Sequence, residues 1–201
     1  MDIAIVRHSI SVGNQADLIS GADSDVALSQ AGIDYAKKVS GVYDWQRFDV
    51  VYASPLQRAV STAKILTQNQ EDIQVDARLS EMHFGDWDGL SADPFRITHP
   101  DAFDYTGMFN ANYSKYAPNS ESYAHLLQRS TSFLDMLKDK RPSQSILLVC
   151  HGLTIRALFA AALGVDVYSF GAPHNIALSE LHLDENDDFR ARILTYNQVL
   201  A

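Results

Sequence analysis

Cysteine is almost absent from this chain of 201 residues: Cys150 stands alone, so no disulfide can form within the chain, which fits a reducing compartment. Positive charge is also scarce, because 16 Lys and Arg stand against 25 Asp and Glu, and the net charge of -9 argues against nucleic acid or an anionic membrane as a partner. The longest apolar window, residues 157–165, is too short to span a bilayer, and residues 1–6 lack the basic start of a secretory signal. We therefore expect a soluble, cytoplasmic protein, and the sequence leaves open whether it is a monomer or a homodimer.

Several catalytic motifs are missing as well. The sequence has neither a GxSxG elbow nor a Walker-type phosphate-binding loop, so serine hydrolases and P-loop enzymes lack support. Five of the seven histidines follow no HExxH or similar ligand spacing; they are His83, His99, His125, His174 and His182. We therefore expect no metal and no cofactor.

Short apolar runs rich in β-branched residues predict buried strands of a parallel sheet over residues 3–6, 49–52 and 145–150. The third run ends in Cys150, which is typical of a packed core thiol rather than a nucleophile. Two alternating segments near the end of the chain, residues 177–183 and 190–196, predict a hairpin or a pair of neighbouring edge strands.

Helical patterns lie between and after the predicted strands. One starts at the N-cap Ser29, and a second starts at Ser54 as N-cap with a proline in its first turn. A third covers residues 121–138, and a fourth follows Gly152. The alternation of strands and helices predicts one domain over residues 1–201, a three-layer α/β/α sandwich with a mostly parallel central sheet.

Residues 90–119 interrupt this alternation. The segment has weak periodicity, three prolines and six aromatic residues. An insertion of this length without a clear element is often a lid or a binding loop, and the alternative is a satellite hydrophobic cluster under a long loop. The sequence does not decide between a lid and such a cluster.

Charged residues directly follow the predicted strands. Arg7 and His8 come after the first strand and His151 after the third, while Arg58 lies in the helix that follows the second. Because the carboxyl ends of parallel strands meet at one edge, we expect these side chains to share that edge. Arg58 in a first helical turn opposes the helix macrodipole, and a bound anion would resolve that conflict.

Phosphoryl transfer requires a nucleophile, fixed positive charge on the equatorial oxygens and a proton donor for the leaving oxygen. Two histidines, two arginines and one carboxylate provide that set without a metal. Glu81 taken alone would be a solvated carboxylate, and a histidine after a strand is more often structural, so only the joint placement indicates function. These residues do not say which histidine attacks.

Residues 6–14, VRHSISVGN, resemble the Arg-His-Gly-Glu-Thr-x-x-Asn signature of the histidine phosphatase, or phosphoglycerate mutase-like, superfamily. Further matches follow in the order of the family over most of the chain outside residues 90–119. They are Leu28-Ser29 with Gly32 and Ala36, residues 52–59 with Thr62-Ala63, residues 79–81 with 84–89, Glu121-Ser122, and residues 149–152.

The resemblance implies a phosphoglycerate mutase-like fold and a role for each matching residue. It implies that His8 is the nucleophile that forms a phosphohistidine and that Glu81 is the proton donor. Arg7, Arg58 and His151 would bind the phosphoryl oxygens, and Asn14 and Gly152 would complete the substrate pocket. The sequence departs from the signature at Ser9, where glycine is usual, and at Ile10, where an acidic residue is usual. We expect the Ser9 side chain near the phosphate, where it could hinder approach or donate a hydrogen bond.

Three functions remain open from the sequence. The first is a phosphatase acting on a small phosphorylated metabolite, and the second is a cofactor-dependent phosphoglycerate mutase, which must hold a second anionic group. Residues 90–119 offer only Arg96 and Lys115 for that group, which favours the phosphatase. The third is a phosphate-binding or interaction module with weak turnover, which the complete catalytic set argues against.

Overall fold

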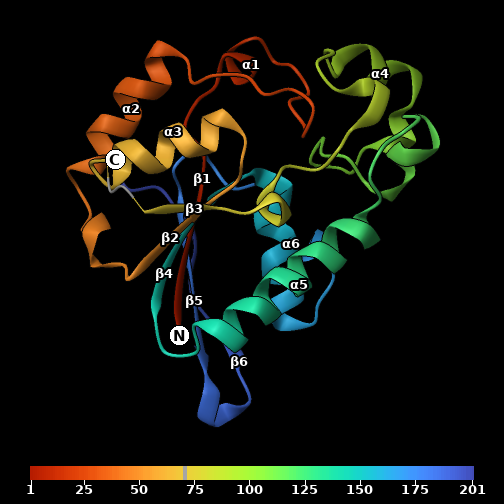
Figure 1. Ribbon diagram of the computed structural model, residues 1–201. Helices are drawn as coiled ribbons and strands as arrows, with labels where there is room; N and C mark the ends of the chain where they lie inside the picture. The colour runs from red at the N-terminus through yellow and green to blue at the C-terminus, as the bar shows by residue number, and fades with distance from the viewer. Residues whose placement is uncertain (70–71) are drawn as a thin grey trace.

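A six-stranded sheet forms the centre of the computed structural model, which describes residues 1–69 and 72–201 (Figure 1). The strands lie in the order β3-β2-β4-β1-β5-β6; the first four are parallel, and β5 and β6 run antiparallel to their neighbours. Their bounds are β1 Asp2–Arg7, β2 Val50–Ala53, β3 Ile73–Val75, β4 Ser145–Cys150, β5 Leu178–Asp184 and β6 Arg190–Gln198.

Helices cover both faces of this sheet. On one face α2 (Gln30–Ser40) and α3 (Gln57–Leu66) pack against Ala4 and Val6 of β1, and on the other α5 (Tyr123–Lys140) and α6 (Gly152–Leu163) pack against Ile3 and Ile5. Alternate residues of one strand therefore enter different cores, which explains why the run is apolar without interruption. The predicted three-layer α/β/α sandwich is confirmed.

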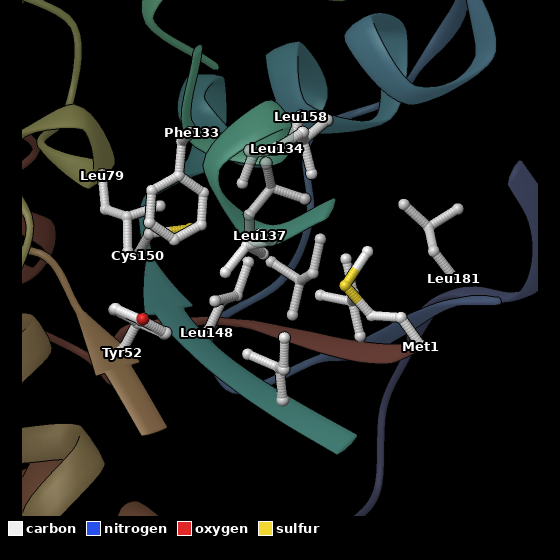
Figure 2. Close-up of a cluster of buried hydrophobic side chains, with 14 of the residues drawn as sticks. Met1, Tyr52, Leu79, Phe133, Leu134, Leu137, Leu148, Cys150, Leu158 and Leu181 are labelled. Carbon is white, nitrogen blue, oxygen red and sulfur yellow. The ribbon is translucent and has the colours of Figure 1, made fainter. Parts of the chain in front are cut away.

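Figure 2 shows the core between α5 and the sheet, in which Cys150 lies beside Leu79 and Phe133. The thiol is fully buried, and this burial raises the pKa of Cys150 well above its ordinary value. A thiol that stays protonated at neutral pH is a poor nucleophile, which agrees with the interpretation of Cys150 as a core residue.

Most predicted elements occur close to their expected bounds. The three apolar runs form β1, β2 and β4, and the C-terminal hairpin forms β5 and β6. Ser29 caps α2 by accepting a hydrogen bond from the backbone N–H of Gly32. The strand β3 is absent from the prediction, because its three residues lie at the edge of the sheet and are largely exposed.

The predicted start of α3 is wrong. The sequence favours Ser54 as the N-cap, but the helix begins at Gln57 and Leu56 is its N-cap. The Ser54 hydroxyl instead accepts a hydrogen bond from the backbone N–H of Leu56 across a turn that contains Pro55. The turn leaves Ser54 at the carboxyl end of β2, where its side chain faces the carboxyl end of β4.

Residues 90–119 contain the short helix α4 (Asp93–Thr98) and pack five of their six aromatic side chains into a third hydrophobic cluster, whereas Tyr105 is exposed. Trp87 stacks on Phe95 with ring centroids 4.1 Å apart, and Leu153 of α6 belongs to the same cluster. A satellite cluster, one of the two alternatives for this segment, is therefore present, and its use as a lid stays a prediction.

The remaining helical pieces are short. They are α1 Val12–Gln15 and 3-10 turns at Trp45–Arg47, Ala77–Leu79, Gly85–Trp87, Pro100–Ala102, Ala111–Lys115, Val167–Ser169 and Glu185–Asp187. Within residues 1–69 and 72–201, no helix combines the length and the apolar character that crossing a membrane requires.

Candidate active site

Three neighbouring strands bring side chains that are distant in sequence to one edge of the sheet. His8 follows β1, Ser54 follows β2 and His151 follows β4. The His8 N–H donates to the carbonyl of Cys150 at 2.9 Å, which continues the pairing of β1 and β4 one residue beyond the strand. The rings of His8 and His151 consequently lie with their centroids 5.0 Å apart.

The tautomer of His8 follows from one contact. Its Nδ1 lies 2.7 Å from the backbone carbonyl of Ser9. Because a carbonyl only accepts, Nδ1 carries the proton and the lone pair resides on Nε2. Burial lowers the pKa of His8 well below 6.5, and the nearby charges of Arg7 and Arg58 lower it further. His8 is therefore neutral at pH 7 and has a free lone pair, as a nucleophile requires.

His151 is fully buried and is oriented by Ser54. Its Nε2 lies 2.7 Å from the Ser54 hydroxyl, whereas its Nδ1 is buried without a hydrogen-bond partner among the described residues. Burial lowers the pKa of His151 well below 6.5, and His8, Arg58 and Arg7 add to that effect. We infer that the Ser54 hydroxyl, which accepts a hydrogen bond from the Leu56 N–H, donates its own proton to Nε2, so that the ring proton of the neutral imidazole lies on Nδ1.

The two arginines are held by backbone carbonyls rather than by carboxylates. Arg7 donates from Nη1 to the carbonyl of Pro173 at 2.9 Å. Arg58 donates to three carbonyls of one loop, those of Ser20, Gly21 and Ser24, at 3.1, 3.0 and 2.6 Å. The Nε of each arginine is buried and has no partner in the described part of the chain. The positive charge of Arg58 is unfavourable near the N-terminus of its helix, and the three loop carbonyls compensate for this in part.

Glu81 lies at the N-terminal end of α6. Glu81 Oε1 accepts a hydrogen bond from the backbone N–H of Met82 at 2.9 Å, and Oε2 accepts one from the backbone N–H of Leu153 at 3.3 Å. A Cβ placed on Gly152 would lie 3.8 Å from both the Arg7 guanidinium carbon and Glu81 Oε2. Glu81 and Arg7 therefore flank Gly152, and a larger residue there would separate them.

A cavity of about 200 Å³ opens at this edge of the sheet. Its polar lining includes Arg7, His8, Asn14, Glu81 and Gly152, whereas Arg58 and His151 are fully buried and do not line it. The rest of the lining is mostly apolar and comes in part from residues 90–119; it includes Leu18, Ile19, Phe84, Arg96, Met108, Phe109 and Leu153.

The surroundings of His8 differ in one respect from what the sequence indicates. Ser9 does not point at the phosphate position, because its hydroxyl donates to the carbonyl of Gly32 at 2.7 Å and its side chain is fully buried. The loop that precedes β5 also contacts the site through Asn175, whereas its neighbour His174 is exposed. Asn175 donates to the carbonyl of His8 at 2.8 Å and to Asn14 Oδ1 at 3.4 Å.

Some contacts that support the site are not predictable from the sequence. Asp88 accepts hydrogen bonds from the N–H groups of Gly21 and Asp23 and from the Ser24 hydroxyl, so it fixes the loop whose carbonyls hold Arg58. The contact of the Ser54 hydroxyl with His151 is likewise absent from the prediction, which treats Ser54 only as an N-cap. Asp88 lies in a stretch that matches the family, but nothing in its spacing indicates which loop it binds.

The site presents unused hydrogen-bond donors. Five buried side-chain nitrogens have no partner among residues 1–69 and 72–201, and three of them belong to Arg7, Arg58 and His151. Leaving a buried donor unpaired costs about 1–3 kcal/mol, so a partner that satisfies these groups is favoured. An anion bound between these donors would satisfy them, and its negative charge would match the two guanidinium groups.

Comparisons with known proteins agree with this chemistry. The sequence model described as "Histidine phosphatase superfamily (branch 1)" matches residues 3–198. Phosphoserine phosphatase 1 of Hydrogenobacter thermophilus is 29% identical over 188 residues, which cover 91% of this chain and 87% of that protein. Phosphoglycerate mutase-like protein 4 of Arabidopsis thaliana is 32% identical over 166 residues, covering 80% and 70%.

A solved structure resembles the whole chain. It is a mycobacterial glucosyl-3-phosphoglycerate phosphatase in complex with VO3, which superposes with a TM-score of 0.83 at 26% sequence identity. The superposition covers 98% of this chain and 99% of the other. The similarity therefore includes residues 90–119 as well as the sheet and its helices.

Proposed function

Since the chain belongs to the histidine phosphatase superfamily (branch 1), we propose that it hydrolyses a small phosphomonoester through a phosphohistidine at His8. The observation that carries this proposal is the state of His8: a neutral imidazole with a free Nε2, at a cavity also lined by Arg7, whose Nε has no partner among the described residues. The acidic chain and its single buried thiol fit a cytoplasmic enzyme.

The first half-reaction transfers the phosphoryl group to the protein. Nε2 of His8 forms a bond to phosphorus as the bond from phosphorus to the ester oxygen breaks. The carboxyl of Glu81 gives its proton to the leaving oxygen, so an alcohol departs. The Nδ1 proton stays hydrogen-bonded to the Ser9 carbonyl, which stabilises the positive charge that the ring acquires.

The second half-reaction returns His8 to its starting state. The Glu81 carboxylate takes a proton from a water molecule, whose oxygen bonds to phosphorus as the bond from phosphorus to Nε2 breaks. Inorganic phosphate leaves, and Glu81 again carries a proton. In both steps we expect the donors of Arg7, Arg58 and His151, each of which has a side-chain nitrogen without a partner in the described part of the chain, to bind the equatorial oxygens and stabilise their charge.

The pocket favours hydrolysis over transfer to a second hydroxyl. A mutase must hold a second anionic group while the phosphoryl group moves. Among the described residues of the insertion, Arg96 is the basic residue that lines the cavity, whereas Lys115 donates to Asn112 at 2.7 Å and does not line it. The cavity of about 200 Å³ and its apolar wall suit a small metabolite with an organic part.

Hydrolysis of para-nitrophenyl phosphate tests the proposal. We expect the wild-type protein to release phosphate and His8→Ala to be inactive. Phosphorus NMR of the wild-type protein trapped during turnover should show an acid-labile phosphoramidate that His8→Ala lacks. Equal rates for the two proteins, or an acid-stable phosphoserine, would show that His8 is not the nucleophile.

A further inference from the structure

A buried ion pair lies beside the segment that carries Glu81. Arg129, on α5, donates from Nε to Glu121 Oε1 at 2.8 Å and from Nη2 to Glu121 Oε2 at 3.1 Å. The two side chains are 13% and 7% exposed. Burial raises the pKa of Glu121, but the hydrogen bonds and charge of Arg129 outweigh it, so the net shift is downward and the carboxylate stays ionised.

The pair binds the backbone on both sides of Glu81. Arg129 donates to the carbonyl of Ser80 at 2.7 Å and to that of Glu81 itself at 3.2 Å. Glu121 accepts a hydrogen bond from the N–H of His83 at 3.2 Å, and its own N–H donates to the carbonyl of His83 at 2.7 Å. One ion pair thus fixes the chain from residue 80 to residue 83.

The segment that carries Glu81 has no regular structure of its own. Residues 81–84 belong to neither a helix nor a strand, and they lie between the 3-10 turns Ala77–Leu79 and Gly85–Trp87. At the start of α6 the Glu81 carboxylate accepts a hydrogen bond of 3.3 Å from the Leu153 N–H, while the Thr154 hydroxyl donates to the Ser80 carbonyl at 2.7 Å and lies 3.3 Å from Glu81 Oε1. A long side chain with such contacts keeps its position only if its backbone is fixed, and small displacements of a catalytic group are costly.

We propose that Arg129, oriented by Glu121, is the positioning residue that keeps the Glu81 carboxyl at the leaving oxygen. This inference rests on the proposed function, in which Glu81 is the proton donor. Arg129 contacts the backbone of Glu81 and not its carboxyl, so it acts through that backbone. Loss of Arg129 therefore affects the step in which the leaving group is protonated more than it affects phosphate binding.

The leaving group of the substrate separates these effects. Benzyl phosphate and para-nitrophenyl phosphate have similar size, but only the benzyl alkoxide needs a proton as it leaves. General acid catalysis contributes about 10²–10⁴-fold to such a reaction. Because kcat/KM reports the transfer to His8, the ratio of kcat/KM for the two esters measures how well the proton donor is placed.

We expect Arg129→Met to lower kcat/KM at least tenfold more for benzyl phosphate than for para-nitrophenyl phosphate. Arg129→Lys should recover part of the loss, because an ammonium group keeps the charge but cannot bind both Glu121 carboxylate oxygens and the carbonyls of Arg78, Ser80 and Glu81 at once. The double variant Glu121→Gln with Arg129→Met avoids a buried unpaired carboxylate and should show the same selective loss in a better folded protein.

Two further variants make the outcome decisive. Leu137→Ala, in the core at the other end of α5, should destabilise the fold without changing the ratio. Glu81→Gln should show the full selective loss. If Glu81→Gln is selective and neither Arg129→Met nor the double variant is, the positioning role is wrong. If Glu81→Gln is not selective, the proposed role of Glu81 is wrong instead.

Discussion

Removal of the Ser54 hydroxyl should disable His151 without touching the pocket wall. The hydroxyl accepts from the Leu56 N–H and lies 2.7 Å from His151 Nε2, an arrangement that places the ring proton on Nδ1. In Ser54→Ala the proton is free to occupy Nε2, so Nδ1 ceases to be a dependable donor to the phosphoryl group. The change also leaves buried groups unpaired, which costs about 1–3 kcal/mol.

A hydrogen bond that stabilises the transition state by about 1.4 kcal/mol accelerates the reaction about tenfold. A donor to developing negative charge contributes up to about 4 kcal/mol. We therefore expect kcat/KM of Ser54→Ala to fall about tenfold to several hundredfold. Nitrogen NMR of labelled histidine should show a change of tautomer at His151 and none at His8. A variant with unchanged kcat/KM and an unchanged His151 tautomer would refute the assignment of the donor to Nδ1.

Three more predictions concern pH, packing and specificity. The pKa values of His8 and His151 are lowered in the folded state, so below pH 6.5 the unfolded chain binds more protons than the folded chain. The free energy of unfolding, measured with urea, should therefore fall as the pH drops from 6.5 to 5.5. Each histidine contributes at most about 1.4 kcal/mol per pH unit to this fall. The variant His8→Gln should show a shallower decline. Gly32→Ala would place a Cβ 1.9 Å from the backbone oxygen of Ile10 and should lower the midpoint of thermal unfolding strongly, whereas Gly171→Ala, with nothing within 4 Å, should not. Arg96→Met should raise KM about threefold to tenfold for esters that carry a second anionic group and leave KM for benzyl phosphate unchanged, because Arg96 lines the cavity but is 45% exposed.

The sheet and the strand ends could be predicted because their signals are local. A continuous apolar run identifies a strand buried on both faces, and the residue after it must lie at the carboxyl edge of the sheet. The positions of Arg7 and His151 at that edge follow from the apolar runs alone. The edge strand β3 lacks such a signal, because three residues at the margin of a sheet bury little and need no apolar run.

The contacts that hold the arginine side chains could not be predicted, because their acceptors are backbone carbonyls of segments distant in the sequence. Arg58 binds the carbonyls of Ser20, Gly21 and Ser24, and a carbonyl is present at every position of the sequence. Arg129 likewise binds the carbonyls of Ser80 and Glu81 from a distant helix, a proximity visible only in the fold. The prediction for Ser54 fails for a similar reason, since a serine before a proline suits an N-cap and a turn equally well.

The use of carbonyls also explains how an acidic chain can bind an anion. In the described part of the chain neither Arg7 nor Arg58 forms an ion pair with a carboxylate, whereas Arg129 is paired with Glu121. A carbonyl satisfies a guanidinium N–H with a dipole and leaves the net positive charge in place, but a carboxylate cancels it. Arg7 and Arg58 therefore keep a local positive field against the net charge of -9, and Arg129, whose charge is neutralised, remains suited to a purely geometric task.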